Sequence, residues 1–371
     1  MTRYFIYGTL LDVALLGIVA PGVVPVAATL AGHGVFWAKG TSYPRIARAA
    51  GTVEGAVLEV DETARARLDF YEGGFGYGLR EVSVDTKGGP VTAWVYWPGD
   101  DVPPPDTPWH LEEWAARFGP MTRHAAREAM EYHGEISAEE LAARMPMIRT
   151  RAHARVLAEA EPAPEYLAPV PDQPAQVVKR RRPYTNFFSV LEYDFQVPRF
   201  DGTLGPVINR AGFVSGDAVV VLPYDPVRDR VMMVEQWRAS AFFRGDPNPW
   251  VLEPVAGRID PGEAPETSAR REAEEEARLS VTDLHAVSRH YPSTGTLTEF
   301  VYTYVGIVDL PDGSDGVAGL ESEDENIRSH ILDWEVFLDW LDGDRFRAGP
   351  LVALGHWLAR HREGLRRDAG V

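Results

Sequence analysis

The sequence predicts a mixed α/β protein of two domains, and three observations support this fold class. Residues 1–100 contain short apolar runs rich in glycine and β-branched residues, separated by turn signals, which is typical of strands. Apolar residues at helical spacing follow from residue 109 to about residue 157. In the second half, predicted strands lie on both sides of one polar helical segment, which indicates an α/β/α sandwich. A chain of 371 residues is long enough for two such cores.

The helical stretch completes the first domain, which we place at residues 1–158. Ser137 is a suitable N-cap residue, and Glu140 three positions later completes a capping box, so a helix is expected to begin there. Residues 159–183 are rich in proline and poor in large apolar side chains, which predicts an extended linker before a second domain at residues 184–371.

Charge and composition exclude several classes of partner. The formal net charge is −18 at pH 7, which repels nucleic acid and anionic lipid, so we expect neither as a partner. The basic run Lys179–Arg182 could argue for nucleic acid, but we assign it to the solvated end of the linker. The chain has no cysteine, which excludes disulfides and thiolate chemistry and suits a cytoplasmic location. The N-terminal residues lack the unbroken apolar run of a signal or a membrane span.

The segment Gly257–Leu279 holds six glutamates. A helix over about 265–278 would place Glu272, Glu275 and Glu276 on one side and Glu274 on another. Alanines 269, 273 and 277 would form a narrow stripe beside this acidic cluster, so the helix could lie close against a sheet. Like charges at this spacing repel one another. A solvated charged helix is one explanation, and a hard cation such as Mg²⁺ held by convergent carboxylates is the other.

The spacing within this segment resembles the Nudix box, G-x5-E-x7-R-E-U-x-E-E-x-G-U, where U is apolar. The positions in register are Gly257, Glu263, Arg271, Glu272, Ala273, Glu275, Glu276 and Leu279. One position departs from the pattern, because Arg278 stands where the family has a glycine that ends the helix. The resemblance covers nearly all of residues 185–360 and is closest to the ADP-ribose pyrophosphatase branch.

That resemblance implies a metal site and a reaction. The implied ligands of Mg²⁺, with Mn²⁺ as the alternative, are the backbone carbonyl of Ala256 and the side chains of Glu272, Glu275, Glu276 and Glu325. The acidic loop 321–325 would supply Glu323 as the catalytic base, although a shift of one or two residues would exchange the roles in this loop. The implied reaction is hydrolysis of ADP-ribose to AMP and ribose 5-phosphate.

Two arginines outside the box are candidate substrate ligands. Arg238 and Arg210 could each hold a phosphate or the ribose end, since a guanidinium pairs bidentately with phosphate oxygens. Either could instead form a surface ion pair. The substrate could also be another nucleoside diphosphate derivative, such as a nucleotide sugar or NADH, and a sensor that binds nucleotide without turnover is the alternative from a different class.

In the first domain, a predicted strand ends in the turn Tyr7-Gly8-Thr9-Leu10, where glycine lets backbone amides approach a ligand. The segments that follow include YPRIARAAGTVEGAVLEVD and ARLDFYEGGFGYGLREVSV. This order resembles the γ-glutamylcyclotransferase-like (AIG2-like) family, which implies a mixed barrel. The turn would then bind a γ-glutamyl group, Glu72 would be the general acid/base, and Tyr43 and Tyr77 would line the pocket. A relative that kept the barrel without turnover is the alternative.

The fusion of these two domains resembles bacterial proteins associated with tellurite resistance, which names a phenotype and no mechanism. Relatives of the second domain dimerise by sharing a sheet, so the resemblance also implies a homodimer through the Nudix domain.

Overall fold

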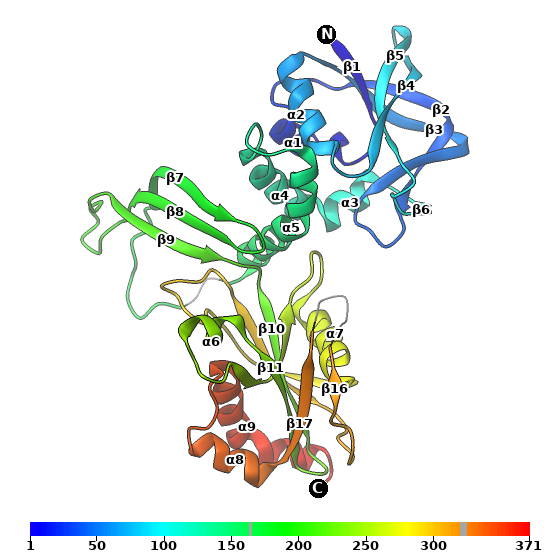
Figure 1. Ribbon diagram of the computed structural model, residues 1–371. Helices are drawn as coiled ribbons and strands as arrows, with labels where there is room; N and C mark the ends of the chain where they lie inside the picture. Colours follow the sequence, from blue (N-terminus) through cyan, green and yellow to red (C-terminus); the bar gives the residue numbers. More distant parts are fainter. Residues whose placement is uncertain (163–164, 320–324) are drawn as a thin grey trace. The chain divides into compact units, whose positions relative to one another are not determined.

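The computed structural model in Figure 1 describes residues 1–162, 165–319 and 325–371. The chain divides into two compact units, Met1–Glu165 and Tyr166–Val371. Within the described parts of the chain, every helix is too short or too polar to cross a bilayer.

The first unit is built around a closed mixed barrel. Its strands are β1 (Thr2–Ile6), β2 (Val26–Ala38), β3 (Pro44–Val60), β4 (Tyr77–Thr86), β5 (Gly89–Pro98) and β6 (Pro105–Pro108). They pair in the order β3-β1-β5-β4-β2-β6, and a further pairing of β2 with β3 closes the barrel. β1 and β5 run parallel, whereas the other neighbouring strands are antiparallel. The mixed barrel that the sequence predicts is therefore confirmed.

Helices pack against the outer face of this barrel. They are α1 (Val13–Val19), α2 (Glu62–Glu72), α3 (Leu111–Arg117), α4 (Gly119–Glu131) and α5 (Ala138–Ala160), with a 3₁₀ turn η1 (Thr9–Leu11) after β1. Side chains alternate along β1, so Phe5 joins the barrel interior while Tyr4 and Ile6 join the core beneath the helices. The predicted capping box at the start of α5 is present, with both Ser137–Glu140 hydrogen bonds formed.

The second unit contains two sheets. A three-stranded sheet has the order β7-β8-β9, with β7 (Gln176–Thr185), β8 (Ser189–Gln196) and β9 (Ile208–Val214). Among the described residues the larger sheet has the order β14-β15-β10-β11-β17-β16, and β12 and β13 pair with β11 and β10. Its strands are β10 (Ala218–Asp225), β11 (Arg230–Trp237), β12 (Trp250–Glu253), β13 (Val255–Arg258), β14 (Asp283–His290), β15 (Val301–Ile307), β16 (Val317–Ala318) and β17 (Ile327–Asp333).

Helices cover both faces of the larger sheet. The helices of this unit are α6 (Ala239–Arg244), α7 (Pro265–Ala277), α8 (Trp334–Asp342) and α9 (Gly349–Asp368). Val220, Leu222 and Tyr224 of β10 share a core with α8 and α9. The alternate residues of β10 face the other way, where α7 packs against β10 and β13. The predicted α/β/α sandwich is confirmed, and β10 is apolar from Ala218 to Pro223 because both of its faces are buried.

The expected linker is shorter in the structure than the sequence suggested. Residues 176–183 belong to β7, so the basic run Lys179–Arg182 lies in a strand and its assignment to a linker end was wrong. β7 pairs with β8, and Arg181 forms ion pairs with Asp194 and Glu192 across the sheet. The charge of Arg181 is therefore matched by acids on the neighbouring strand.

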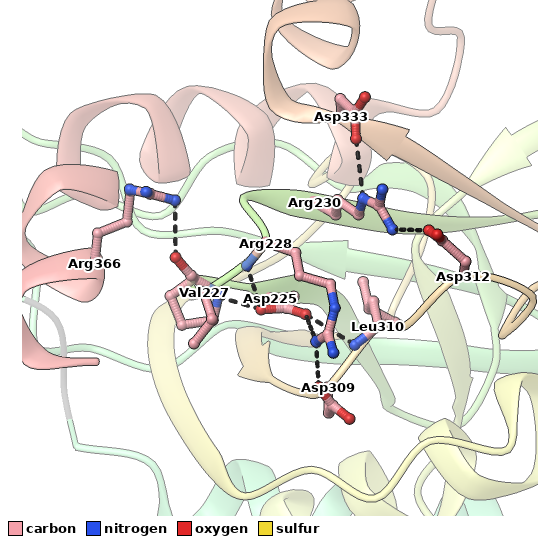
Figure 2. Close-up of polar contacts among 10 residues, drawn as sticks. Asp225, Val227, Arg228, Arg230, Asp309, Leu310, Asp312, Asp333 and Arg366 are labelled. Carbon is pink, nitrogen blue, oxygen red and sulfur yellow. Dashed lines mark hydrogen bonds and ion pairs between the residues drawn. The ribbon is translucent and has the colours of Figure 1, made fainter. Parts of the chain in front are cut away.

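The turn between β10 and β11 is fixed by a buried carboxylate (Figure 2). Asp225 accepts hydrogen bonds from the backbone N–H groups of Val227, Arg228 and Leu310, and it forms an ion pair with Arg228. Burial would raise the pKa of Asp225, but the hydrogen bonds outweigh it and the pKa is lowered. Because its charge is satisfied by groups of the turn itself, this cluster holds the sheet together.

Candidate active sites

Helix α7 carries the glutamates of the second unit. Proline at its first position suits a helix start, and the alanine stripe at residues 269, 273 and 277 is buried as predicted. Glu274 is exposed, whereas Glu276 is only 2% exposed. The helix ends at Ala277, and Arg278 takes the left-handed conformation (φ 55°, ψ 34°) that a glycine would adopt without strain.

Arg271 fixes the positions of the surrounding carboxylates. Its guanidinium lies 2.8 Å from a carboxylate oxygen of both Glu272 and Glu275, and 3.2 Å from one of Glu263. It also donates to the carbonyl oxygen of Arg258 at the end of β13. One arginine therefore ties the helix to the strand before it and holds two glutamates of the predicted metal site in place.

Glu272 and Glu276 form the inner part of this site. The pKa of Glu272 is raised to about 7 and that of Glu276 to about 8, mainly by burial and in smaller part by repulsion from Glu325. Glu276 accepts a hydrogen bond from the backbone N–H of Ala256 at 3.0 Å. In a strand the N–H and C=O of one residue point the same way, so the carbonyl of Ala256 also faces Glu276.

Gly257 explains why the box begins with glycine. A Cβ atom at this position would lie 2.0 Å from the carboxyl carbon of Glu272, which is too short for a non-bonded contact, so the Glu272 side chain would have to move. The Glu272 carboxylate therefore rests directly against the strand backbone, beside the carbonyl of Ala256. The site depends on the absence of a side chain here.

These residues fit a hard divalent cation. The donors are carboxylate and carbonyl oxygens, the ligands that Mg²⁺ and Mn²⁺ prefer. Glu272, Glu276 and Glu325 repel one another electrostatically, which a cation would relieve. Among residues 1–162, 165–319 and 325–371, no three acidic or histidine side chains converge closely enough to hold a metal by themselves. Glu323, the predicted base, lies outside the described residues.

The two candidate substrate arginines differ in position. Arg238 forms an ion pair with Glu253 at 2.6 Å, and its charge lowers the pKa of Glu276, so it lies near the carboxylate cluster. Arg210 lies on β9 in the other sheet, is exposed, and donates to the carbonyl of Asn209. The contacts of the described residues do not connect Arg210 with the cluster, and its role stays a prediction.

Three residues near this site were missed in the sequence. Glu253 is the partner of Arg238, and Arg258 stacks on the ring of Phe187 with 4.2 Å to its centroid. Burial raises the pKa of Glu299, and both Arg258 and Arg238 lower it in part. These groups come from separate strands and loops, so no local spacing could have connected them.

The first unit has its own cavity, of about 180 Å³. One water needs only about 10–15 Å³, so there is room for a small molecule. The lining includes the whole Tyr7-Gly8-Thr9-Leu10 turn, Glu72, Tyr43 and Tyr77. Gly8 allows close packing here, because a Cβ atom on it would lie 2.9 Å from the ring of Pro44. The structure thus brings together all the residues that the sequence places in the first domain's pocket.

Glu72 is the only acidic residue among those that line this cavity. It is the last residue of α2, and burial raises its pKa to about 7. The surrounding phenols belong to Tyr7, Tyr71, Tyr77 and Tyr96, and burial is the largest cause that raises the pKa of each of them. Glu72 therefore changes protonation near neutral pH, while these four phenols stay neutral.

The comparisons with known proteins agree with the two predicted domain families. Residues 4–116 match the model for gamma-glutamyl cyclotransferase, AIG2-like, and residues 214–349 match the model for the NUDIX domain. The ADP-ribose pyrophosphatase of Escherichia coli (strain K12) is 38% identical over 194 residues, which are 52% of this chain and 91% of that protein. The chain belongs to the Nudix family and is a Nudix hydrolase with an AIG2-like N-terminal domain.

Further relatives cover the same part of the chain. The ADP-ribose pyrophosphatase of Haemophilus influenzae is 32% identical over 188 residues, which are 50% of this chain and 86% of that protein. The GDP-mannose pyrophosphatase of Enterobacter sp. (strain 638) is 26% identical over 185 residues, which are 49% of this chain and 94% of that protein. The second unit is therefore related most closely, among these three, to the two ADP-ribose pyrophosphatases.

Proposed function

We propose that the second unit hydrolyses the diphosphate bond of ADP-ribose and releases AMP and ribose 5-phosphate, with Mg²⁺ or Mn²⁺ as cofactor. The observation that carries this proposal is the placement of buried Glu276 and partly buried Glu272 against the strand backbone at Ala256 and Gly257. The identity to proteins named ADP-ribose pyrophosphatase supports the choice of substrate.

The proposed ligands of the cation are Ala256, Glu272, Glu275, Glu276 and Glu325. When bound, a divalent cation neutralises the diphosphate, polarises a phosphorus and lowers the pKa of a coordinated water. Arg271 keeps Glu272 and Glu275 in place for this task through its ion pairs. Removing water from the margin of α7 strengthens each of these electrostatic interactions.

Arg238 is the proposed phosphate ligand. It is 41% exposed and anchored by Glu253, so its remaining N–H groups can reach a bound diphosphate. The attacking water must lose a proton, and Glu323 is the predicted base for this step.

A panel of nucleoside diphosphate derivatives tests this proposal. The full-length chain is incubated with ADP-ribose, GDP-mannose and NADH in Mg²⁺, and AMP and other products are quantified. We expect ADP-ribose to be the best substrate and a chelator to stop the reaction until Mg²⁺ is restored. A clear preference for another compound would change the substrate, whereas tight binding of ADP-ribose without turnover would support the sensor alternative.

We also propose γ-glutamyl cyclotransfer in the first unit, because Glu72 faces the same cavity as the Tyr7–Leu10 turn and has a pKa of about 7. In this reaction the α-amine attacks the γ-carbonyl, the C–N bond of 5-oxoproline forms and the bond to the leaving amine breaks. Glu72 would take the proton from the attacking amine and return it to the leaving amine. Release of 5-oxoproline from γ-glutamyl peptides measures this activity, and its absence would favour the barrel as a binding module.

The resemblance also predicts an oligomeric state and a phenotype for this protein. We expect a homodimer formed through the Nudix domain, and light scattering of the full-length chain gives the mass that decides it. The association with tellurite resistance and the cytoplasmic location stay predictions from the sequence.

A further inference from the structure

Arg149 lines the cavity of the first unit together with Glu72 and the Tyr7–Leu10 turn. It lies on α5 (Ala138–Ala160), beyond residues 4–116 that match the AIG2-like family model. The helical extension of this chain therefore contributes a positive charge to a pocket that is also lined by the barrel, α2, α3 and α4.

The charge of Arg149 has no acidic counterpart. Among the described residues its ion pairs include no carboxylate, and its Nη2 donates to the hydroxyl of Ser42. Burial lowers its pKa, and the nearby Tyr71 and Tyr43 offset this only in part. Arg149 is partly buried, and a guanidinium that is withdrawn from water without a carboxylate partner is costly, so a site that keeps one indicates an anionic ligand.

A second arginine on the same helix, Arg151, has the carboxylate partner that is expected of an arginine with a structural role. Arg151 is 6% exposed and forms an ion pair with Glu128 at 2.6 Å, supported by further hydrogen bonds to that carboxylate. Arg149 is two residues away and has no such partner. Packing of α5 therefore does not by itself explain why residue 149 carries a charge.

Residues 42–44 contact Arg149 and also contact other residues that line the pocket. The Ser42 hydroxyl accepts from Arg149, and the Ser42 carbonyl accepts from Trp114 Nε1 at 3.1 Å. Pro44 packs against Gly8 and accepts a hydrogen bond from Tyr77 at 3.0 Å. One short segment thus positions the arginine, the glycine turn and a tyrosine of the cavity.

Arg149 and Glu72 both line the cavity. Among the ion pairs of the described residues, none joins Arg149 to Glu72. A molecule in the cavity can therefore meet a carboxylate at one place and a guanidinium at another, as a compound with both an amine and a carboxylate requires.

We propose that Arg149 binds a carboxylate of the small molecule that occupies this pocket, so that the first unit selects amino-acid derivatives with a free carboxylate. This inference deepens the proposed cyclotransferase by naming the charge of its ligand. It makes α5 part of the binding site.

Calorimetry on the full-length chain with 5-oxoproline and its neutral amide, 5-oxoprolinamide, tests the proposal. We expect the wild type to bind 5-oxoproline at least about tenfold more tightly, since a charge-assisted bidentate pair is lost with the amide. Arg149→Gln should remove this preference, and Arg149→Lys should restore part of it. Arg155→Gln, on an exposed position of the same helix, should leave it unchanged.

Three results would overturn the proposal: binding of neither probe by the wild type, equal binding of both, or an unchanged preference in a folded Arg149→Gln variant. If that variant does not fold, Ser42→Ala replaces it, because it removes the hydroxyl that holds Arg149 and should weaken the preference several-fold. A carboxylate preference that depends on Arg149, together with no release of 5-oxoproline, would support this inference and remove the cyclotransferase.

Discussion

The carboxylates of the two units differ in the charged groups that surround them. In the second unit the charges of Glu272 and Glu325 add to the effect of burial in raising the pKa of Glu276, and the charge of Glu325 does the same for Glu272. In the first unit Glu72 stands alone, and burial accounts for its raised pKa. A bound cation reduces the repulsion among several neighbouring carboxylates. A single desolvated carboxylate instead loses its unfavourable charge when it binds a proton. The same loss of solvent thus prepares one site for a metal and the other for proton transfer.

The largest effect is expected from Glu276→Gln. The substitution keeps an acceptor for the N–H of Ala256 but removes the charge that a cation needs, so ADP-ribose hydrolysis should fall at least about 1000-fold, or about 4 kcal/mol in the barrier. The rate of AMP release in Mg²⁺ measures it, with circular dichroism to confirm the fold. Glu274→Gln on the exposed side of α7 is the matched control and should keep nearly full activity. Retained activity in Glu276→Gln would overturn the metal assignment.

Glu72→Gln tests the role of burial in the first unit, because its effect on stability should depend on pH. Because the folded pKa of about 7 lies above the ordinary value of 4.5, ionising Glu72 destabilises the fold as the pH rises from 4.5 to 7. The glutamine variant lacks this cost, so it should be more stable than the wild type by up to about 3 kcal/mol above pH 7, with the gap closing below pH 4.5. It should also lose any 5-oxoproline release by about 100-fold.

Denaturant unfolding of the first unit between pH 4 and pH 8.5 measures this gap. Glu54→Gln provides the control, because Glu54 is exposed on β3 and its replacement should change stability little at any of these pH values. A gap for Glu72→Gln that is constant with pH would show that Glu72 does not ionise in a desolvated pocket.

Gly257→Ala tests the close packing of Glu272 in the other unit. The added Cβ would meet the Glu272 carboxyl group at 2.0 Å, so that side chain must leave its position. We expect hydrolysis to fall roughly 10–100-fold and stability to fall by about 1–3 kcal/mol. Gly349→Ala is the control, since a Cβ there meets nothing within 4 Å. Unchanged hydrolysis in Gly257→Ala would mean that the observed position of Glu272 does not matter for turnover.

The two sites also differ in how far the sequence could predict them. The glutamates of α7 lie within one helix, so its period alone places Glu272, Glu275 and Glu276 together and Glu274 apart. In the first unit the sequence placed Glu72 and the Tyr7–Leu10 turn only through resemblance. Arg149 was missed because it enters the cavity from a helix more than a hundred residues after the turn, and only tertiary packing connects them.

The fold shows the same limit. Short apolar runs between turn signals predicted the strands, and the capping box predicted the start of α5 correctly. The strand β7 was missed because Arg181 looks solvated until Asp194 of β8 is seen opposite it. A charged strand is recognisable only with its partner.

The smallest effect is expected at the end of α7, where Arg278 departs from the family pattern. A left-handed conformation costs a residue with a Cβ roughly 1–2 kcal/mol, which glycine avoids, although glycine loses about 0.5–1 kcal/mol through its freer unfolded state. Arg278→Gly should therefore stabilise the protein by about 0.5 kcal/mol, measured by urea unfolding, with hydrolysis unchanged. Arg278→Ala keeps the strain and loses only the bond from the side chain to the carbonyl of Val317, so it should gain nothing. If glycine and alanine have the same effect, the side chain of Arg278 matters more than its backbone, and the helix end does not need glycine at all.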